Sequence, residues 1–261
     1  MILSERDMRV HLDGAKRDLY FKLLAHTDRR IAEAINSVPR ELFVDPSGLY
    51  NAYYNQVASA PVDGDHTSVS QPTVVADMLN LLGPQPHEAV VEIGTGSGFQ
   101  AAVMARLARR VVTFEVDEKL AEVARRKLRE LHIKNVTVIT ADASESPDKS
   151  EPTDKLIVTA AMFPDPHSPL FQLVKDDGIC VVPIGGVNGN FRECHLLRLR
   201  KTAYGMVADQ FLEGYSFVPV LGESGWDGML NKLIERQRNK FYQELSANAQ
   251  MLGESNSWGT E

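Results

Sequence analysis

The stretch Val90-Val91-Glu92-Ile93-Gly94-Thr95-Gly96-Ser97-Gly98-Phe99-Gln100 decides the fold of this chain. It has the pattern of an apolar strand, a loop with glycine at every second position, and the start of a helix. Glycine lets a backbone approach a ligand closely, and open α/β sheets bind their cofactors at the carboxyl ends of strands. The stretch therefore predicts a pocket for a nucleotide-type cofactor. The alternative is a tight turn that serves the fold alone.

The residues around this loop narrow the kind of cofactor. Dinucleotide-binding loops favour glycine at the sixth position, where this chain has Phe99, and no Gly-Lys-Ser/Thr follows as a Walker loop requires. Glu115 comes 21 residues after Gly94, at the end of the next apolar run. A carboxylate there can accept hydrogen bonds from both hydroxyls of an adenosine ribose. We expect an adenosine-bearing cofactor that is not a dinucleotide, the alternative being a surface glutamate.

From residue 89 onward, short apolar runs alternate with helical patterns. The expected strands cover residues 89–94, 111–117, 135–142, 154–161 and 178–186, and the expected helices residues 99–110, 118–132 and 170–174. This alternation predicts a parallel sheet with crossover helices, so the fold class is α/β with a Rossmann-like sheet. Two further extended runs, 194–201 and 211–221, fit an antiparallel pair that closes one edge.

The segments on either side of this sheet are expected to be helical. Residues 1–88 contain two amphipathic helices up to residue 36 and a third over residues 72–82, with proline in its first turn. We expect them to form an N-terminal helical cap on a core of residues 89–221. Residues 222–261 are expected to form a C-terminal helical extension and tail, and apolar residues recur there at helical spacing. That apolar stripe must pack on its own domain or on a second subunit, which makes a homo-oligomer one expectation.

Composition and charge exclude several classes of protein. With 261 residues, 43% of them hydrophobic, the chain can bury a substantial core. Its net charge of -7 argues against a nucleic-acid partner. No apolar run approaches the roughly 20 residues of a membrane span, and the first residues lack a signal core, so a cytoplasmic location without a membrane is expected. Two cysteines and scattered histidines predict no metal site.

Two more strand ends are candidates for the cofactor pocket. Asp142 and Ala143 close the third expected strand and can hydrogen-bond an adenine amino group through the carboxylate and a backbone donor. Thr159 closes the fourth strand, in a run of small residues that can pass close to the rest of the cofactor. The alternatives are an exposed loop acid at residue 142 and simple strand packing at residue 159.

Collinear segments of this chain resemble the protein-L-isoaspartate (D-aspartate) O-methyltransferase family. In the sheet region the similar stretches are residues 91–107, 111–113, 135–138, 157–161, 181–186 and 217–219. Two upstream elements, Val38-Pro39-Arg40-Glu41-Leu42-Phe43-Val44 and Ser68-Val69-Ser70-Gln71-Pro72, also look like that family's hallmark sequences. Few other methyltransferases share this upstream pair of elements. The pair therefore distinguishes this family from other methyltransferases, which the glycine loop alone cannot do.

The resemblance implies a class I S-adenosylmethionine-dependent methyltransferase. Such an enzyme transfers the methyl group to the carboxylate of an L-isoaspartyl residue in a peptide or damaged protein, with S-adenosylhomocysteine as product, in protein repair. A carboxylate with a reference pKa of about 3.9 is already the nucleophile at pH 7, so alignment matters more than proton abstraction. The donor would be bound by Glu92, Gly94, Thr95, Gly96, Ser97, Gly98, Glu115, Asp142, Ala143 and Thr159.

On the acceptor side, the resemblance assigns the catalytic role to Ser70, the serine of the Ser-Gln-Pro element. Its hydroxyl can hold one carboxylate oxygen and direct the other toward the methyl group. Ser68, Val69 and Val218 would line the substrate groove. Without the resemblance, Ser70 is best interpreted as an ordinary helix cap before Pro72.

The acceptor side also departs from the family's usual pattern. The element here begins His66-Thr67-Ser68, without the usual glycine and first glutamine, and Asn55 follows Tyr54 where the family usually has an acidic residue. His66 is either a base for a less acidic nucleophile or a solvated loop histidine. These changes leave open a methyltransferase for an aspartate or C-terminus of a dedicated biosynthetic peptide. A noncatalytic module that binds the donor is a third hypothesis.

Overall fold

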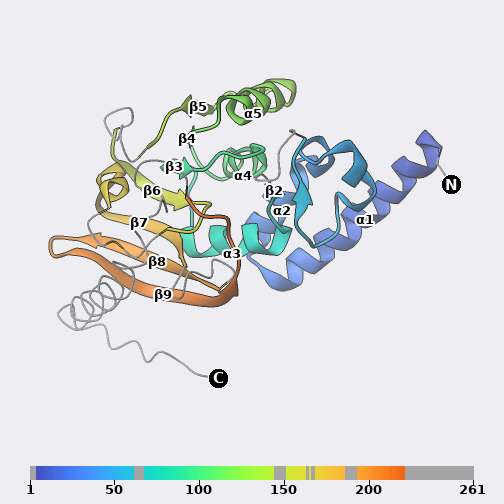
Figure 1. Cartoon of the computed structure of the whole chain (residues 1–261). Helices are drawn as coiled ribbons and strands as arrows, with labels where there is room; N and C mark the ends of the chain where they lie inside the picture. Colours follow the sequence, from blue (N-terminus) through green and yellow to red (C-terminus); the bar gives the residue numbers. More distant parts are fainter. Residues whose placement is uncertain are drawn as a thin grey trace. The chain divides into compact units, whose positions relative to one another are not determined.

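A computed structural model describes residues 4–61, 68–143, 151–162, 165, 168–185 and 193–220 of the chain (Figure 1). These residues belong to two compact units. The first contains residues 1–88 and 95–140, and the second contains residues 89–94 and 141–261. The expected extension over residues 222–261 lies outside the described residues, as does His66. The division into cap, core and extension therefore stays a prediction.

The first unit begins with the expected helices, of which α1 is the long one beside the N label in Figure 1. Helix α1 (Glu5–His26) is capped by Ser4, and α2 (Arg29–Ser37) is capped by Asp28. Short 3-10 turns follow at η1 (Arg40–Leu42) and η2 (Pro46–Asn51). Helix α3 (Pro72–Leu82) has the predicted bounds and ends at Gly83, whose φ of 58° is left-handed. Amphipathic periodicity, together with Pro72 for α3, therefore predicted these helices correctly.

Two strand pairs also belong to the first unit. The short strands β1 (Ala58–Ser59) and β2 (Ser68–Val69) are antiparallel. The longer strands β4 (Arg110–Glu115) and β5 (Val136–Thr140) are parallel, as predicted, and α5 (Glu118–Glu130) connects them. A parallel pair joined by a helix is the unit from which Rossmann-like sheets are built.

Helix α4 (Phe99–Met104) is shorter than predicted, because the expectation extended it to residue 110. The Asn135 side chain donates hydrogen bonds to the carbonyls of Ala105 and Ala108, at 2.9 and 3.3 Å. A helix that continued to residue 110 would use the Ala105 carbonyl for its own hydrogen bond to the residue 109 amide. That amide instead donates to the Glu88 carbonyl, at 2.9 Å. Residues 105–109 therefore separate α4 from β4, and their partners are too distant in sequence for local periodicity to predict the end of the helix.

The second unit contains strands β3 (Ala89–Ile93), β6 (Thr153–Val158), β7 (Val174–Ile184), β8 (Cys194–Thr202) and β9 (Gly205–Tyr215). They lie side by side in that order. The β3–β6 and β6–β7 pairs are parallel, whereas β7–β8 and β8–β9 are antiparallel. The long hairpin of β8 and β9 is drawn in orange in Figure 1. The predicted change from parallel strands to an antiparallel closing pair is confirmed.

The bounds of β7 and β9 differ from the prediction. Strand β7 starts at Val174, because the expected helix there is only a 3-10 turn, η4 (Pro169–Leu173). Strand β9 starts at Gly205, six residues before the predicted start at residue 211. Its first half carries the buried apolar residues Met206, Val207 and Ala208. The charged residue that follows, Asp209, lies 3.6 Å from Arg198 Nε and 3.2 Å from Arg200 Nη2 of β8. A paired charge tolerates burial that an isolated one does not.

The described part of the chain contains neither a membrane-spanning helix nor a cluster of metal ligands. None of its helices combines the length and the apolar character that a membrane span requires. Within the same ranges, no cluster of three or more His, Cys, Asp and Glu side chains could hold a metal ion.

Candidate functional site

The glycine loop has a backbone that only glycine adopts easily. Gly94, Gly96 and Gly98 have φ values of 93°, 52° and 88°. In the second unit, a Cβ added at Gly94 would lie 2.4 Å from Thr159 Oγ1. In the first unit, a Cβ at Gly98 would lie 3.0 Å from the Cβ of Ala124, on helix α5. Left-handed backbone and lack of space thus both require glycine at these two positions.

Glu115 lies at the end of β4, as predicted, and its carboxylate holds the glycine loop. One oxygen, Oε2, accepts a hydrogen bond from the Gly96 amide at 2.8 Å, and Oε1 accepts one from the Asp117 amide at 3.2 Å. An ionised carboxylate has about four lone-pair positions, so both oxygens can accept further bonds. The Glu115 side chain is buried, with 8% of its surface exposed. It can therefore fix the loop and still accept ribose hydroxyls.

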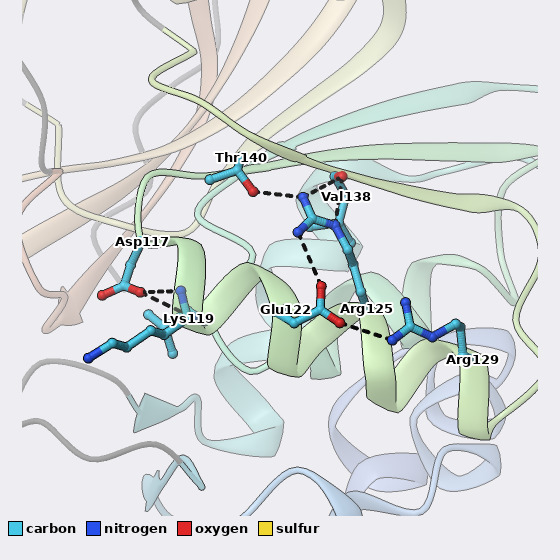
Figure 2. Close-up of polar contacts among 8 residues, drawn as sticks. Asp117, Lys119, Glu122, Arg125, Arg129, Val138 and Thr140 are labelled. Carbon is cyan, nitrogen blue, oxygen red and sulfur yellow. Dashed lines mark hydrogen bonds and ion pairs between the residues drawn. The ribbon is translucent and has the colours of Figure 1, made fainter.

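A second acid, two residues after Glu115, caps the next helix. Asp117 caps α5 by accepting hydrogen bonds from the amides of Lys119 and Leu120, at 2.8 and 3.1 Å (Figure 2). The short segment between β4 and α5 is thus fixed by two carboxylates, from Glu115 and Asp117. Such a rigid segment is what a precise acceptor of ribose hydroxyls needs.

The side chains of three other predicted donor residues are directed into the protein. Thr95 Oγ1 lies 2.7 Å from Thr113 Oγ1, and Ser97 Oγ accepts a hydrogen bond from the Phe99 amide at 3.3 Å. Both residues are 4% exposed, and Glu92 on β3 is fully buried. Any contact of Thr95 and Ser97 with a donor would therefore use their backbone. Glu92 would act only through the residues that surround it.

In the second unit, Thr159 is bonded to the loop. Its hydroxyl lies 3.0 Å from the carbonyl oxygen of Ile93 and 2.6 Å from that of Gly94, so its one proton is shared between them. This geometry indicates that Thr159 shapes the loop. Ala143 is buried, whereas Asp142 is partly exposed. Val218 is exposed, and its carbonyl accepts a hydrogen bond from the Ala161 amide at 2.7 Å.

Ser70 is not the cap of helix α3. The residue at the cap position is Gln71, and its side chain makes no capping bond. Instead, Asn55 Oδ1 accepts a hydrogen bond from the Thr73 amide at 3.1 Å, so a residue far away in the sequence caps the helix. Among the described residues, the Ser70 hydroxyl makes no hydrogen bond. The interpretation of Ser70 as an ordinary helix cap is wrong, and no hydrogen bond within the described residues prevents its hydroxyl from binding a ligand.

The neighbours of Ser70 differ in exposure. Ser68 is exposed, whereas the Val69 side chain is buried and only 1% exposed. Ser68 can therefore meet a substrate with its side chain, and Val69 only with its backbone. The predicted substrate-lining roles of both residues and of Val218 stay predictions.

Sequence reasoning assigned no role to Arg40, which the structure places next to Ser70. Its guanidinium donates hydrogen bonds to the carbonyls of Ala52, Gln56, Val69 and Ser70. Burial lowers the pKa of Arg40 to about 10, which still leaves the group charged at pH 7. The available signal was an arginine inside the apolar segment 38–44, because a buried arginine must find acceptors.

Parallel strands joined by helices, a first strand that ends in a left-handed glycine loop, and an acid at the end of the next strand define a class I S-adenosylmethionine-dependent methyltransferase fold. The family model for Protein-L-isoaspartate(D-aspartate) O-methyltransferase matches residues 16–225. The chain belongs to this family. The resemblance and the fold class inferred from the sequence are both confirmed.

Individual relatives agree with this assignment. The chain is 39% identical over 200 residues to "Protein-L-isoaspartate O-methyltransferase" of Methanoregula boonei. The aligned region covers 77% of this chain and 88% of the relative. The chain is 37% identical over 202 residues to the protein of the same name from Roseobacter denitrificans, covering 77% of this chain and 91% of the relative.

Solved structures show the same fold. A protein-L-isoaspartate O-methyltransferase structure matches with a TM-score of 0.71 and 28% identity, over 86% of this chain and 69% of the other. A Plasmodium falciparum protein whose crystal structure contains S-adenosyl-L-homocysteine matches with a TM-score of 0.61 and 18% identity. That second match covers 80% of this chain and 95% of the other, and it supports the fold alone.

Proposed function

We propose that this chain is a repair enzyme that transfers a methyl group from S-adenosylmethionine to the carboxylate of an L-isoaspartyl residue in a peptide or damaged protein. Its family and its curated relatives carry that activity in their names. The observation that carries the proposal is the Ser70 hydroxyl, which makes no hydrogen bond to any residue that the structure describes and lies in the segment that resembles the family's active-site element. Because Asn55 caps helix α3, Ser70 can bind a substrate oxygen.

When bound, the donor supplies a methyl group on a positively charged sulfur. The protein must bind the donor and orient the carboxylate of the substrate toward that methyl group. One carboxylate oxygen forms a bond to the methyl carbon as the carbon–sulfur bond breaks. The products are a neutral methyl ester and S-adenosylhomocysteine, and no proton moves. The Ser70 hydroxyl donates a hydrogen bond to the other carboxylate oxygen and so orients the nucleophile. Glu115 and the glycine loop would hold the donor, Glu115 through its carboxylate and the loop through the close approach of its backbone.

The first prediction concerns the substrate. Incubation with labelled donor and a peptide that contains L-isoaspartate should give base-labile methyl ester, whereas the same peptide with ordinary aspartate should give little. The isoaspartyl residue presents its α-carboxylate directly on the Cα atom, whereas the carboxylate of ordinary aspartate is one carbon further from the main chain, and alignment of that group decides the rate. Counting ester by base hydrolysis measures the result. Ester on the aspartyl peptide or at a free C-terminus, with none on the isoaspartyl peptide, would favour a dedicated peptide substrate.

The second prediction separates substrate orientation from donor binding. Ser70→Ala should lower kcat on the isoaspartyl peptide by about tenfold, the order expected for loss of one orienting hydrogen bond. The dissociation constant of the donor, measured by calorimetry, should change by less than about twofold. Ser37→Ala is the matched control, since Ser37 Oγ donates to the Ala34 carbonyl at the end of α2. If Ser70→Ala also abolished donor binding, the assigned role of Ser70 would be wrong.

Several partner statements stay predictions. The substrate is a protein or peptide with an isoaspartyl residue, as the family implies. A cytoplasmic location, the lack of nucleic-acid and membrane partners, the lack of a metal and a homo-oligomer through residues 222–261 are expectations from the sequence.

A further inference from the structure

Arg40 connects parts of the first unit that are distant in sequence. It lies in η1 and is 1% exposed. Its Nη1 donates to the Ala52 carbonyl at 3.2 Å, and its Nη2 lies 3.0 Å from the Gln56 carbonyl oxygen. The same Nη2 lies 3.3 Å from the Val69 carbonyl oxygen and 3.0 Å from that of Ser70. One buried guanidinium group is thus hydrogen-bonded to carbonyls in two separate segments of the chain.

The segment that carries Ser70 is held through its backbone on two sides. On one side, Val69 pairs with Ala58 and Ser68 pairs with Ser59 in the β1–β2 ladder. On the other side, the carbonyls of Val69 and Ser70 accept from Arg40. Since these contacts use only backbone atoms, they fix the position of Ser70 without occupying its hydroxyl.

The same guanidinium also touches the start of helix α4. Its Cζ lies 5.4 Å from the centre of the Phe99 ring, and the Phe43 ring meets Phe99 edge-on at 5.6 Å. Phe99 follows Gly98 directly and is buried. A desolvated cation over an aromatic ring is attracted to it and limits how the two groups can shift. Arg40 is therefore in contact both with the Ser70 segment and with the residue that follows the glycine loop.

We infer that Arg40 is a positioning residue for methyl transfer, which sets the place of the Ser70 segment relative to the start of α4. This inference rests on the proposed function and extends it to a residue that touches neither donor nor substrate. Arginine suits the task because its planar group has several donors in fixed directions and a flat face for the ring. Lysine keeps the charge but has a single nitrogen, so it cannot reach all four carbonyls and cover Phe99.

The test compares two conservative substitutions of partly or fully buried arginines. Arg40→Lys should lower kcat on the isoaspartyl peptide by about tenfold, because misplacement of a reacting group slows transfer. Its donor dissociation constant should stay within about threefold of wild type. Arg125→Lys is the control: Arg125 Nη2 donates to the Val138 carbonyl and to Thr140 Oγ1, at 3.1 and 2.7 Å, from α5 to β5 (Figure 2). This control should leave kcat within about twofold.

A second variant covers the case in which Arg40→Lys does not fold. Phe99→Leu keeps every hydrogen bond of Arg40, retains an apolar side chain and removes the ring beneath the cation. It should lower kcat by about threefold with an unchanged donor dissociation constant. The inference is overturned if neither variant lowers kcat per folded molecule, or if donor binding falls in parallel with kcat. Absence of ester from the wild-type enzyme would instead reject the proposed function, so the two failures are distinguishable.

Discussion

Replacement of Gly94 by alanine (Gly94→Ala) should weaken binding of S-adenosylmethionine by at least about a hundredfold. The residue has a φ of 93°, and the new Cβ would lie 2.4 Å from Thr159 Oγ1. Left-handed backbone costs about 1–2 kcal/mol for a side chain, and the close contact adds to that cost. Thr159 cannot turn away freely, since its hydroxyl is bonded to the carbonyls of Ile93 and Gly94. The loop must therefore move, and calorimetric titration with S-adenosylhomocysteine measures the loss of affinity.

A control and a double variant identify the cause of this effect. Gly83→Ala places alanine at a φ of 58° with no atom within 4 Å of its Cβ. It therefore has the conformational free-energy cost of a left-handed backbone but no steric clash of the Cβ. It should leave donor affinity unchanged and lower only thermal stability. The double variant Gly94→Ala/Thr159→Ala should recover part of the affinity, because the Thr159 Cβ is 3.8 Å from the added Cβ. No recovery would mean that the threonine hydroxyl is not the obstacle.

Glu115→Gln should weaken donor binding by about a hundredfold. The carboxylate already accepts from the amides of Gly96 and Asp117, and it has lone pairs left for ribose hydroxyls. A glutamine has one carbonyl oxygen, so its NH₂ group must face one of these backbone N–H donors whichever way it turns. Hydrogen bonds to a charged group contribute about 1.5–3 kcal/mol each, and about 2.7 kcal/mol corresponds to a hundredfold change.

The matched control for this second substitution is Glu122→Gln on α5. Glu122 pairs with Arg125 and Arg129 at the surface (Figure 2), at 3.6 and 3.0 Å, and its side chain is 57% exposed. Its replacement removes the same charge from the same unit and should leave donor affinity within about twofold. Equal donor affinity in Glu115→Gln and wild type would contradict the assignment of Glu115 to the ribose.

Local patterns in the sequence predicted the elements that local interactions determine. Helix α3 has the predicted bounds because Pro72 starts it and Gly83 ends it. The glycine loop was predictable for a similar reason, since three alternating glycines follow an apolar strand. The early end of α4 was not predictable, because the partners of residues 105–109 are distant in sequence, such as Asn135, which lies 27 and 30 residues from the carbonyls that it binds.

The candidate site shows the same division. The position of Glu115 at the end of a strand was predictable from its spacing to Gly94, whereas no sequence pattern indicated a role for Arg40. The four carbonyls that Arg40 binds lie between 12 and 30 residues along the chain. Asn55 was noted only as a departure from the family's pattern, and its partner Thr73 is 18 residues away. Pairings at such separations follow from tertiary structure, which no short sequence window contains.

The cap that Asn55 provides for helix α3 leaves Ser70 without a capping role. Loss of a capping side chain usually costs a helix about 1 kcal/mol, so a catalytic serine that also capped its helix could not change without weakening the fold. In this chain the capping side chain is at residue 55, so replacing residue 70 does not remove the cap of α3. Substitution of residue 70 should therefore cost helix α3 little stability, whereas substitution of residue 55 should cost it more.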